Sequence, residues 1–232
     1  MKQKQIYLIC VTGGRPEAFG LLGGYINRQT YQGPATFLVV DDCDPATPLP
    51  DSRFAVEVIR PSWRWQKGDN TQCQSMALAL EQVGDNDTVL IIEDDDAYLQ
   101  NHIEATLHEL ETVELTGEKV ARYFNVYTRR HQTMSQSNHA TLASTGVRGN
   151  ALKLLREICD RPARSIDINL WHEFHGSKRL TENANVVGIK GLPGRSGIGI
   201  GHRPAFGVPD TDNTLQKWLG ARAAAYDKFG DR

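Results

Sequence analysis

The chain has 232 residues, of which 40% are hydrophobic and 23% are charged, a balance typical of a globular protein with a buried core. A formal net charge of −2 argues against a protein that coats nucleic acid non-specifically, although it leaves room for a local basic patch. No apolar run approaches the roughly 18 residues that indicate a membrane span. We therefore expect a soluble protein with one domain over residues 1–232.

The N-terminal sequence MKQKQIYLICVTGG has a basic start but lacks the small-residue cleavage site of a secretory signal. Its short apolar stretch is therefore interpreted as a buried strand. The four cysteines are widely separated and form no C-x-x-C pair, so we expect neither a zinc site nor a disulfide framework. Both features favour a cytoplasmic protein with reduced thiols.

Three apolar runs, over residues 6–11, 36–40 and 88–92, predict central strands that are buried on both faces. Helical spacing of apolar residues follows the first run, and a second helix is predicted before the third run. This alternation predicts an α/β fold of three layers, with a mostly parallel sheet and helices on both faces. Ligands of such sheets bind outside the carboxyl ends of the strands, which is where the acidic clusters of this sequence fall.

Further along the chain, the sequence predicts a strand over residues 120–127 and helices over 150–158 and 166–174. The tail from Ile189 onward is rich in glycine and proline, and its stretch over residues 191–210 is too dense in glycine for a regular helix. We expect this tail to be ordered around a ligand.

The strongest chemical signal is the acidic run Glu93-Asp94-Asp95-Asp96, directly after a predicted buried strand. Four adjacent carboxylates at such a position repel one another, so a compensating cation is expected. Carboxylate oxygens beside phosphates are the ligands that Mg²⁺ or Mn²⁺ prefers. The alternative is a solvated acidic turn.

The order of motifs resembles that of the family 2 glycosyltransferases and their GT-A relatives. A strand leads into T-G-G-R-P, a second strand into V-V-D-D, and K-G-D-N precedes the helix before the acidic run. The resemblance implies a GT-A (Rossmann-like) fold, with residues 1–100 binding the nucleotide sugar and residues 101–232 binding the acceptor. It makes Glu93-Asp94-Asp95 the D-x-D element with Asp95 on the metal, while the glutamate leaves open a shifted pairing of Asp94 with Asp96.

The resemblance also implies roles on the acceptor side. SIDINLW is similar to the x-E-D segment of GT-A enzymes, which makes Asp167 the catalytic base, although Ile166 stands where the family has an acid. GT-A enzymes often supply a C-terminal histidine to the metal, and His202 in GIGIGHRP has the matching place. The alternative for Asp167 is an ordinary aspartate at a helix N-terminus.

On the donor side, the resemblance gives Asp41 the place of the acid that contacts the nucleoside. Thr12 and Arg15 match positions that lie along the base and phosphates of the nucleotide sugar. The other donor-side candidates are Lys67, Asp69, Asn70 and Asp94.

The resemblance as a whole implies a metal-dependent glycosyltransferase that uses Mn²⁺ or Mg²⁺ and moves a sugar from a nucleotide diphosphate, by default UDP, to an acceptor hydroxyl. Direct displacement inverts the anomeric centre, and a retaining reaction is the alternative. Two other functions remain open, a nucleotidyltransferase and a nucleotide-sugar-binding module without activity.

Two stretches interleave basic and aromatic residues, one at Trp63-Arg64-Trp65 and one that includes Arg129 and Arg130. Such mixtures suit base stacking and phosphate contacts. Small enzymes that resemble this chain glycosylate hydroxymethylated bases in bacteriophage DNA, so DNA is one candidate acceptor. The alternative is core aromatics beside solvated charges.

Overall fold

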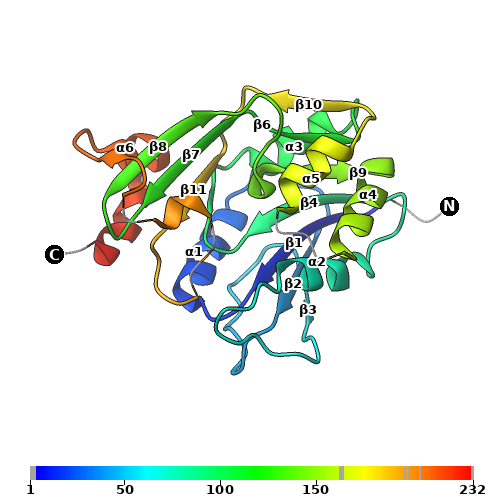
Figure 1. The fold of residues 1–232 in the computed structure, drawn as a ribbon, viewed down its shortest axis with the longest axis horizontal. Helices are drawn as coiled ribbons and strands as arrows, with labels where there is room; N and C mark the ends of the chain where they lie inside the picture. Colours follow the sequence, from blue (N-terminus) through cyan, green and yellow to red (C-terminus); the bar gives the residue numbers. More distant parts are fainter. Residues whose placement is uncertain (1–3, 162–164, 196, 198, 204, 231–232) are drawn as a thin grey trace.

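The computed structural model describes residues 4–161, 165–195, 197, 199–203 and 205–230 (Figure 1). Its strands are β1 (Ile6–Thr12), β2 (Thr36–Asp41), β3 (Ala55–Ile59), β4 (Thr88–Glu93), β5 (Ala97–Tyr98), β6 (Leu115–Glu118), β7 (Val120–Asn125), β8 (Arg130–Ser135), β9 (Gly146–Arg148), β10 (Lys178–Thr181), β11 (Val186–Lys190) and β12 (Val208–Pro209). Its α-helices are α1 (Pro16–Ile26), α2 (Gln72–Leu80), α3 (His102–Glu109), α4 (Gly149–Cys159), α5 (Ile166–Glu173) and α6 (Thr214–Leu219). Short 3₁₀ helices are η1 (Leu142–Ser144), η2 (Ile200–His202) and η3 (Gly220–Phe229).

The larger sheet has seven strands in the order β10-β6-β9-β4-β1-β2-β3. Strands β3, β2, β1 and β4 are parallel neighbours, and β9 runs antiparallel to β4 and β6. Alternate residues of a strand point to opposite faces, so the apolar runs of β1 and β4 supply side chains to two separate cores. The predicted mostly parallel sheet is thus confirmed.

Helices cover both faces of this sheet. Helix α1 buries Phe19 and Leu22 in one core, together with Leu8 of β1. Helices α2, α4 and α5 pack in the other core, where Met76 and Leu152 meet the opposite side chains of the same strands. The predicted three-layer arrangement is confirmed (Figure 1).

A smaller sheet of five strands, in the order β12-β8-β7-β11-β5, was not predicted beyond its strand β7. Figure 1 shows it at the end of the molecule that also carries α6. Only three residues separate its strand β5 from the end of β4 in the larger sheet. The acidic run therefore lies in the turn that joins the two sheets.

The predicted helices 150–158 and 166–174 correspond to α4 and α5, and the predicted strand 120–127 ends two residues earlier, at Asn125. The tail from Ile189 onward was expected to be ordered around a ligand, but Ile189 and Lys190 belong to β11, and residues 214–229 form α6 and η3. Among the described helices, none is long and apolar enough to cross a membrane.

Candidate active site

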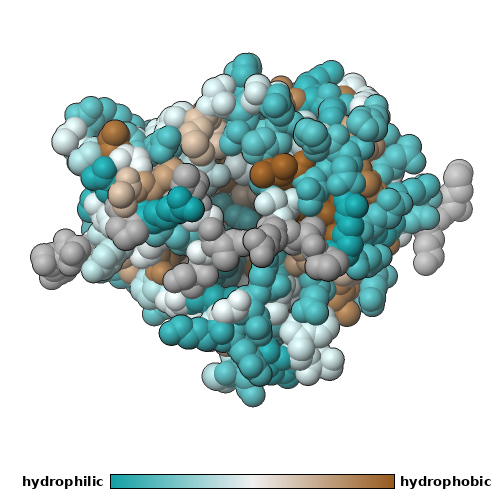
Figure 2. Space-filling model, viewed as in Figure 1, coloured by the Kyte–Doolittle hydropathy of each residue, from teal (hydrophilic) through white to brown (hydrophobic). Residues whose placement is uncertain are grey.

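Strands β1, β2 and β4 end at the same edge of the larger sheet. Their register places Thr12 opposite Asp41 and Val11 opposite Glu93, so the residues that follow these strands converge. A cavity of about 490 Å³ opens at this edge. The face drawn in Figure 2 is hollowed near its centre. The predicted position of the site, outside the carboxyl ends of parallel strands, is where this cavity lies.

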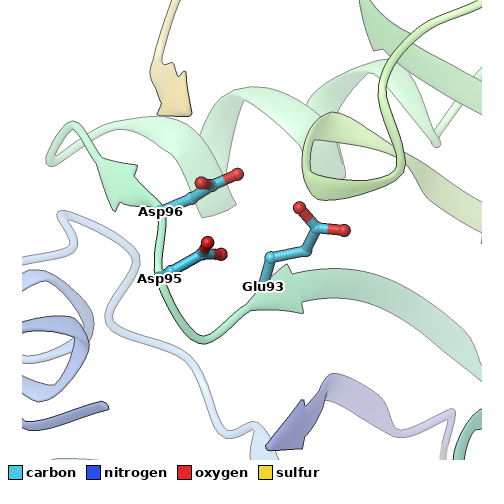
Figure 3. Close-up of side chains that lie close together, drawn as sticks. All are labelled: Glu93, Asp95 and Asp96. Atoms are coloured by element: carbon cyan, nitrogen blue, oxygen red, sulfur yellow. The ribbon is translucent and has the colours of Figure 1, made fainter. Parts of the chain in front are cut away.

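The acidic turn, residues 93–96, forms one wall of the cavity. Carboxylate oxygens of Glu93, Asp95 and Asp96 lie within 4.8 Å of one another, and Figure 3 shows the three side chains on the same side of the turn. Two hydrogen bonds fix the turn. The backbone N–H of Glu93 donates to the Tyr98 hydroxyl (2.7 Å), and that of Ile189 donates to Asp96 Oδ1 (3.0 Å).

Two cations lie against the acidic turn. The Arg15 guanidinium lies 2.5 Å from Asp94 and 3.0 Å from Asp95. Lys190 Nζ lies 2.8 Å from Asp96 Oδ1 and 3.4 Å from Asp95 Oδ2. Four carboxylates against two cations leave two formal negative charges when every group is ionised. A divalent cation matches that remainder.

The pKa values of these acids also reflect the excess of negative charge in the turn. Burial, followed by the charge of Asp96, raises the pKa of Glu93 to about 8. Burial also raises the pKa of Asp96 to about 6. For Asp95, burial opposes ionisation, but Lys190 and Arg15 outweigh it and lower the pKa. A carboxylate held ionised beside two acids that resist ionisation is a donor set that fits Mg²⁺ or Mn²⁺.

Asp94 lies outside this group of three acids. Its Oδ2 accepts a hydrogen bond from the Thr12 hydroxyl (2.7 Å), and its other oxygen pairs with Arg15. Because the side chain is only 1% exposed, these contacts hold Thr12 and Arg15 in the cavity wall. The clustered acids are Glu93, Asp95 and Asp96, so the geometry favours Asp95 over the shifted pairing of Asp94 with Asp96.

The opposite side of the cavity is built around Asp42. Arg195 donates to both of its oxygens, at 2.8 and 3.1 Å, and the Thr71 hydroxyl donates to it as well. The same guanidinium lies 4.7 Å from the centre of the Trp65 ring, a cation–π contact. A Cβ on Gly13 would collide with the Asp42 carboxylate, so this close approach requires glycine. One arginine thus joins three loops of the cavity.

Asp167 enters the same cavity from the first turn of α5. Its Oδ1 accepts the backbone N–H of Ile168 (2.9 Å). Burial raises its pKa, against the opposing effects of that hydrogen bond and of His139. Its charge also contributes to the raised pKa of Glu93, and both carboxylates line the cavity. A carboxylate with a raised pKa at a cavity wall is suited to accepting a proton.

His202 lines the cavity from η2, outside the compact group of three acids. Burial, followed by the charge of Lys190, lowers its pKa to about 4. The imidazole is therefore neutral at pH 7, the form that binds metals. Its charged form would lower the pKa of Asp95, and both side chains line the cavity.

Solved structures of TarS from S. aureus share this fold. The match to TarS 1–349 in complex with UDP-GlcNAc has a TM-score of 0.56 and 15% identity, over 83% of this chain and 59% of that one. The chain has a GT-A-type fold. The unliganded form gives 0.53 and 11%, over 80% and 60% of the two chains. The UDP complex gives 0.52 and 13%, over 81% and 60%.

This chain therefore spans about three fifths of the TarS 1–349 chains it matches. No protein-family model matches the sequence, and no curated protein does. At this level of identity the likeness is one of fold, so the roles of individual residues on this GT-A-type fold depend on the geometry described above.

The donor-side candidates separate into two groups. Thr12, Arg15, Asp69, Asn70 and Asp94 line the cavity together with the acidic turn. Asp41 and Lys67 are not among the lining residues of the cavity. Lys67 is exposed and lies in a turn together with Gly68.

Asp41 is the last residue of β2 and is buried. It accepts hydrogen bonds from the backbone of Thr47 (2.7 Å) and Cys43 (3.0 Å), and it pairs with Arg60. Because successive residues at a strand end point to opposite sides, Asp42 is the acid that reaches the cavity.

We expect Asp41→Ala to lower the free energy of unfolding by about 3 kcal/mol, since it leaves Arg60 and two buried N–H groups without their acceptor. Lys67→Ala, at an exposed site, is expected to stay within about 0.5 kcal/mol of wild type. Urea unfolding monitored by circular dichroism measures both. Equal stability of the two variants would contradict the structural role of Asp41.

Arg129 and Arg130 were predicted as contacts to a DNA acceptor, and the structure gives them other partners. Arg130 donates to the carbonyls of Phe206 (3.1 Å) and Gly207 (2.6 Å). Arg129 stacks on Phe124, with its guanidinium carbon 5.2 Å from the ring centre. Both arginines thus contact β7 or the C-terminal segment, and these contacts do not support the interpretation of this stretch as a surface for DNA.

Sequence reasoning missed three side chains of the site. Asp42 adjoins Asp41 in the same motif, so only the strand's alternation distinguishes them. Lys190 is the last residue of the buried strand β11 and follows the apolar run VVGI, so a charge at the end of an apolar run is the signal that could have identified it. Arg195 has no local signal, because its partner Asp42 lies 153 residues away.

Proposed function

We propose that this chain is a metal-dependent glycosyltransferase that moves a sugar from a nucleotide diphosphate donor to an acceptor hydroxyl. The observation that carries the proposal is that the group of three acids and Asp167 line one cavity, at the carboxyl ends of the parallel strands of a GT-A-type fold. The matched TarS structures include complexes with UDP-GlcNAc and with UDP, which supports a UDP-linked donor here.

The donor is assigned to the side of the cavity formed by the loops after β1 and β2. Asp42, Thr71 and Arg195, joined by their hydrogen bonds, line the part of the cavity that is assigned to the nucleoside. Thr12 and Arg15 lie between them and the acidic turn, so a diphosphate bound to Arg15 lies next to the carboxylates. Asp69 and Asn70 form the rim, from the segment before α2.

Glu93, Asp95 and Asp96 are the residues assigned to a divalent cation, with neutral His202 as a further donor. When bound, Mg²⁺ or Mn²⁺ neutralises charge on the departing diphosphate. Arg15 contributes a fixed positive charge to the same region and is held there by Asp94. The pKa of Arg15 is raised because the acidic turn outweighs its burial, so it stays charged.

Asp167 is assigned the role of general base. Its carboxylate accepts the proton of the acceptor hydroxyl while that oxygen bonds to the anomeric carbon and the bond from that carbon to the diphosphate oxygen breaks. Direct displacement of this kind inverts the anomeric centre. Its place on the wall formed by α5, with the acidic turn as another wall, supports this division between acceptor and donor sides.

The acceptor class is left as a hydroxyl compound. A hydroxymethylated base in DNA stays one candidate, but the engaged side chains of Arg129 and Arg130 do not support it. Hydroxymethylated and unmodified DNA therefore form one matched pair in an acceptor screen. Transfer to the modified DNA alone would establish it as the acceptor.

The direct test is to incubate the protein with a panel of nucleotide sugars, with Mn²⁺ and with a chelator, and to measure release of nucleoside diphosphate. We expect release from a UDP-linked sugar in the presence of Mn²⁺ and little release with the chelator. Binding of the donor without any release would indicate a binding module. Release of pyrophosphate from a nucleoside triphosphate would indicate a nucleotidyltransferase.

A further inference from the structure

Lys190 is held in the acidic turn by the pairing of strands. Strand β11 lies between β7 and β5, with Val187 opposite Ala97, so the end of β11 is fixed beside the residues that precede β5. The N–H of Ile189 donates to Asp96, and the backbone oxygen of Lys190 accepts from Val126 (2.8 Å). The lysine is therefore positioned by two sheet contacts.

The Lys190 side chain has little freedom to leave. It is 8% exposed, and Gly201 packs so closely on its stem that a Cβ there would lie 2.9 Å from Lys190 Cγ. Burial opposes its charge, but Asp95 and Asp96 outweigh this effect and raise its pKa. The ammonium is thus in contact with two of the three acids assigned to the metal.

We propose that Lys190 is a built-in cation that holds Asp95 and Asp96 together without metal and weakens the affinity of this cluster for a divalent ion. The inference rests on the proposed metal site. Like charges a few ångströms apart repel each other strongly where water is scarce, so the lysine opposes a second cation at the same carboxylates. It is a positioning residue that acts through the carboxylates.

Two variants isolate the charge. Lys190→Met removes the ammonium and keeps an unbranched side chain, whereas Lys190→Arg keeps the charge. The measurement is Mn²⁺ binding to the protein without donor, by the loss of the electron paramagnetic resonance signal of free Mn²⁺ at pH 8. We expect Lys190→Met to bind Mn²⁺ at least about tenfold more tightly than wild type, and Lys190→Arg to resemble wild type.

Unchanged or weaker Mn²⁺ binding by Lys190→Met, including no binding by either protein, overturns the inference. Lys190→Gln, which keeps a hydrogen-bond donor toward Asp96, provides the same test if the methionine variant does not fold. Thermal unfolding shows whether each variant is folded. Release of nucleoside diphosphate from the panel of nucleotide sugars is measured separately with the wild-type protein. Diphosphate release together with unchanged Mn²⁺ affinity rejects the role of Lys190 alone, whereas no release from any donor rejects the proposed function.

Discussion

Asp167→Asn is expected to lower the turnover number by about two to four orders of magnitude, the usual contribution of a positioned general base. The amide keeps the size and the hydrogen bond to Ile168 but cannot take up the acceptor proton. Donor affinity is expected to stay close to wild type, because Asp167 belongs to the wall formed by α5. Steady-state kinetics with donor and acceptor varied in turn separates the two effects.

Asp160→Asn is the matched control, the same chemical change at an exposed carboxylate after α4, and it is expected to leave turnover unchanged.

The rate of the wild-type enzyme is also expected to depend on pH through Asp167. Since burial raises the pKa of Asp167, the base becomes protonated, and the rate falls, at a higher pH than for an ordinary aspartate. Weaker donor binding with little loss of rate in Asp167→Asn would remove this residue from catalysis.

Asp95→Ala is expected to reduce turnover at saturating Mn²⁺ by at least about a hundredfold, because it deletes the one clustered acid whose pKa is lowered. The fold is expected to persist, since Arg15 keeps Asp94 and Lys190 keeps Asp96 as partners. Activity is measured across a Mn²⁺ titration, with unfolding followed in parallel.

The exposed Asp212 provides the control for this substitution, because Asp212→Ala removes a carboxylate outside the cavity lining. It is expected to retain the wild-type response to Mn²⁺. Full activity of Asp95→Ala at saturating Mn²⁺ would mean that the metal, if one is used, is held elsewhere.

The sequence was sufficient to predict the parallel strands β1, β2 and β4 of the larger sheet, but not its strands β6, β9 and β10. Apolar runs that end in charged residues identify buried parallel strands and their carboxyl ends together, and these ends form the cavity edge. The distinction between Asp41 and Asp42 depends on the loop after β2. Arg60 and Thr47 engage the first acid, and neither contact has a local pattern.

The smaller sheet could not be predicted because it pairs segments far apart in the chain. Strand β5 has two residues, too few to show a period, and its partner β11 begins 88 residues after it ends. That pairing places Lys190 against Asp96. The sequence alone therefore could not give the charge balance of the acidic turn. The argument that a divalent cation, and not a monovalent one, compensates the turn depends on the position of Lys190 in the structure.

A crystal structure of this protein with UDP and Mn²⁺ tests the central claim most directly. We predict nucleotide in the cavity beside Asp42, Mn²⁺ between Asp95 and the diphosphate oxygens, and the Asp167 carboxylate facing the space next to the terminal phosphate. UDP bound away from the acidic turn, or bound there with no ion between the carboxylates and the diphosphate, would contradict it.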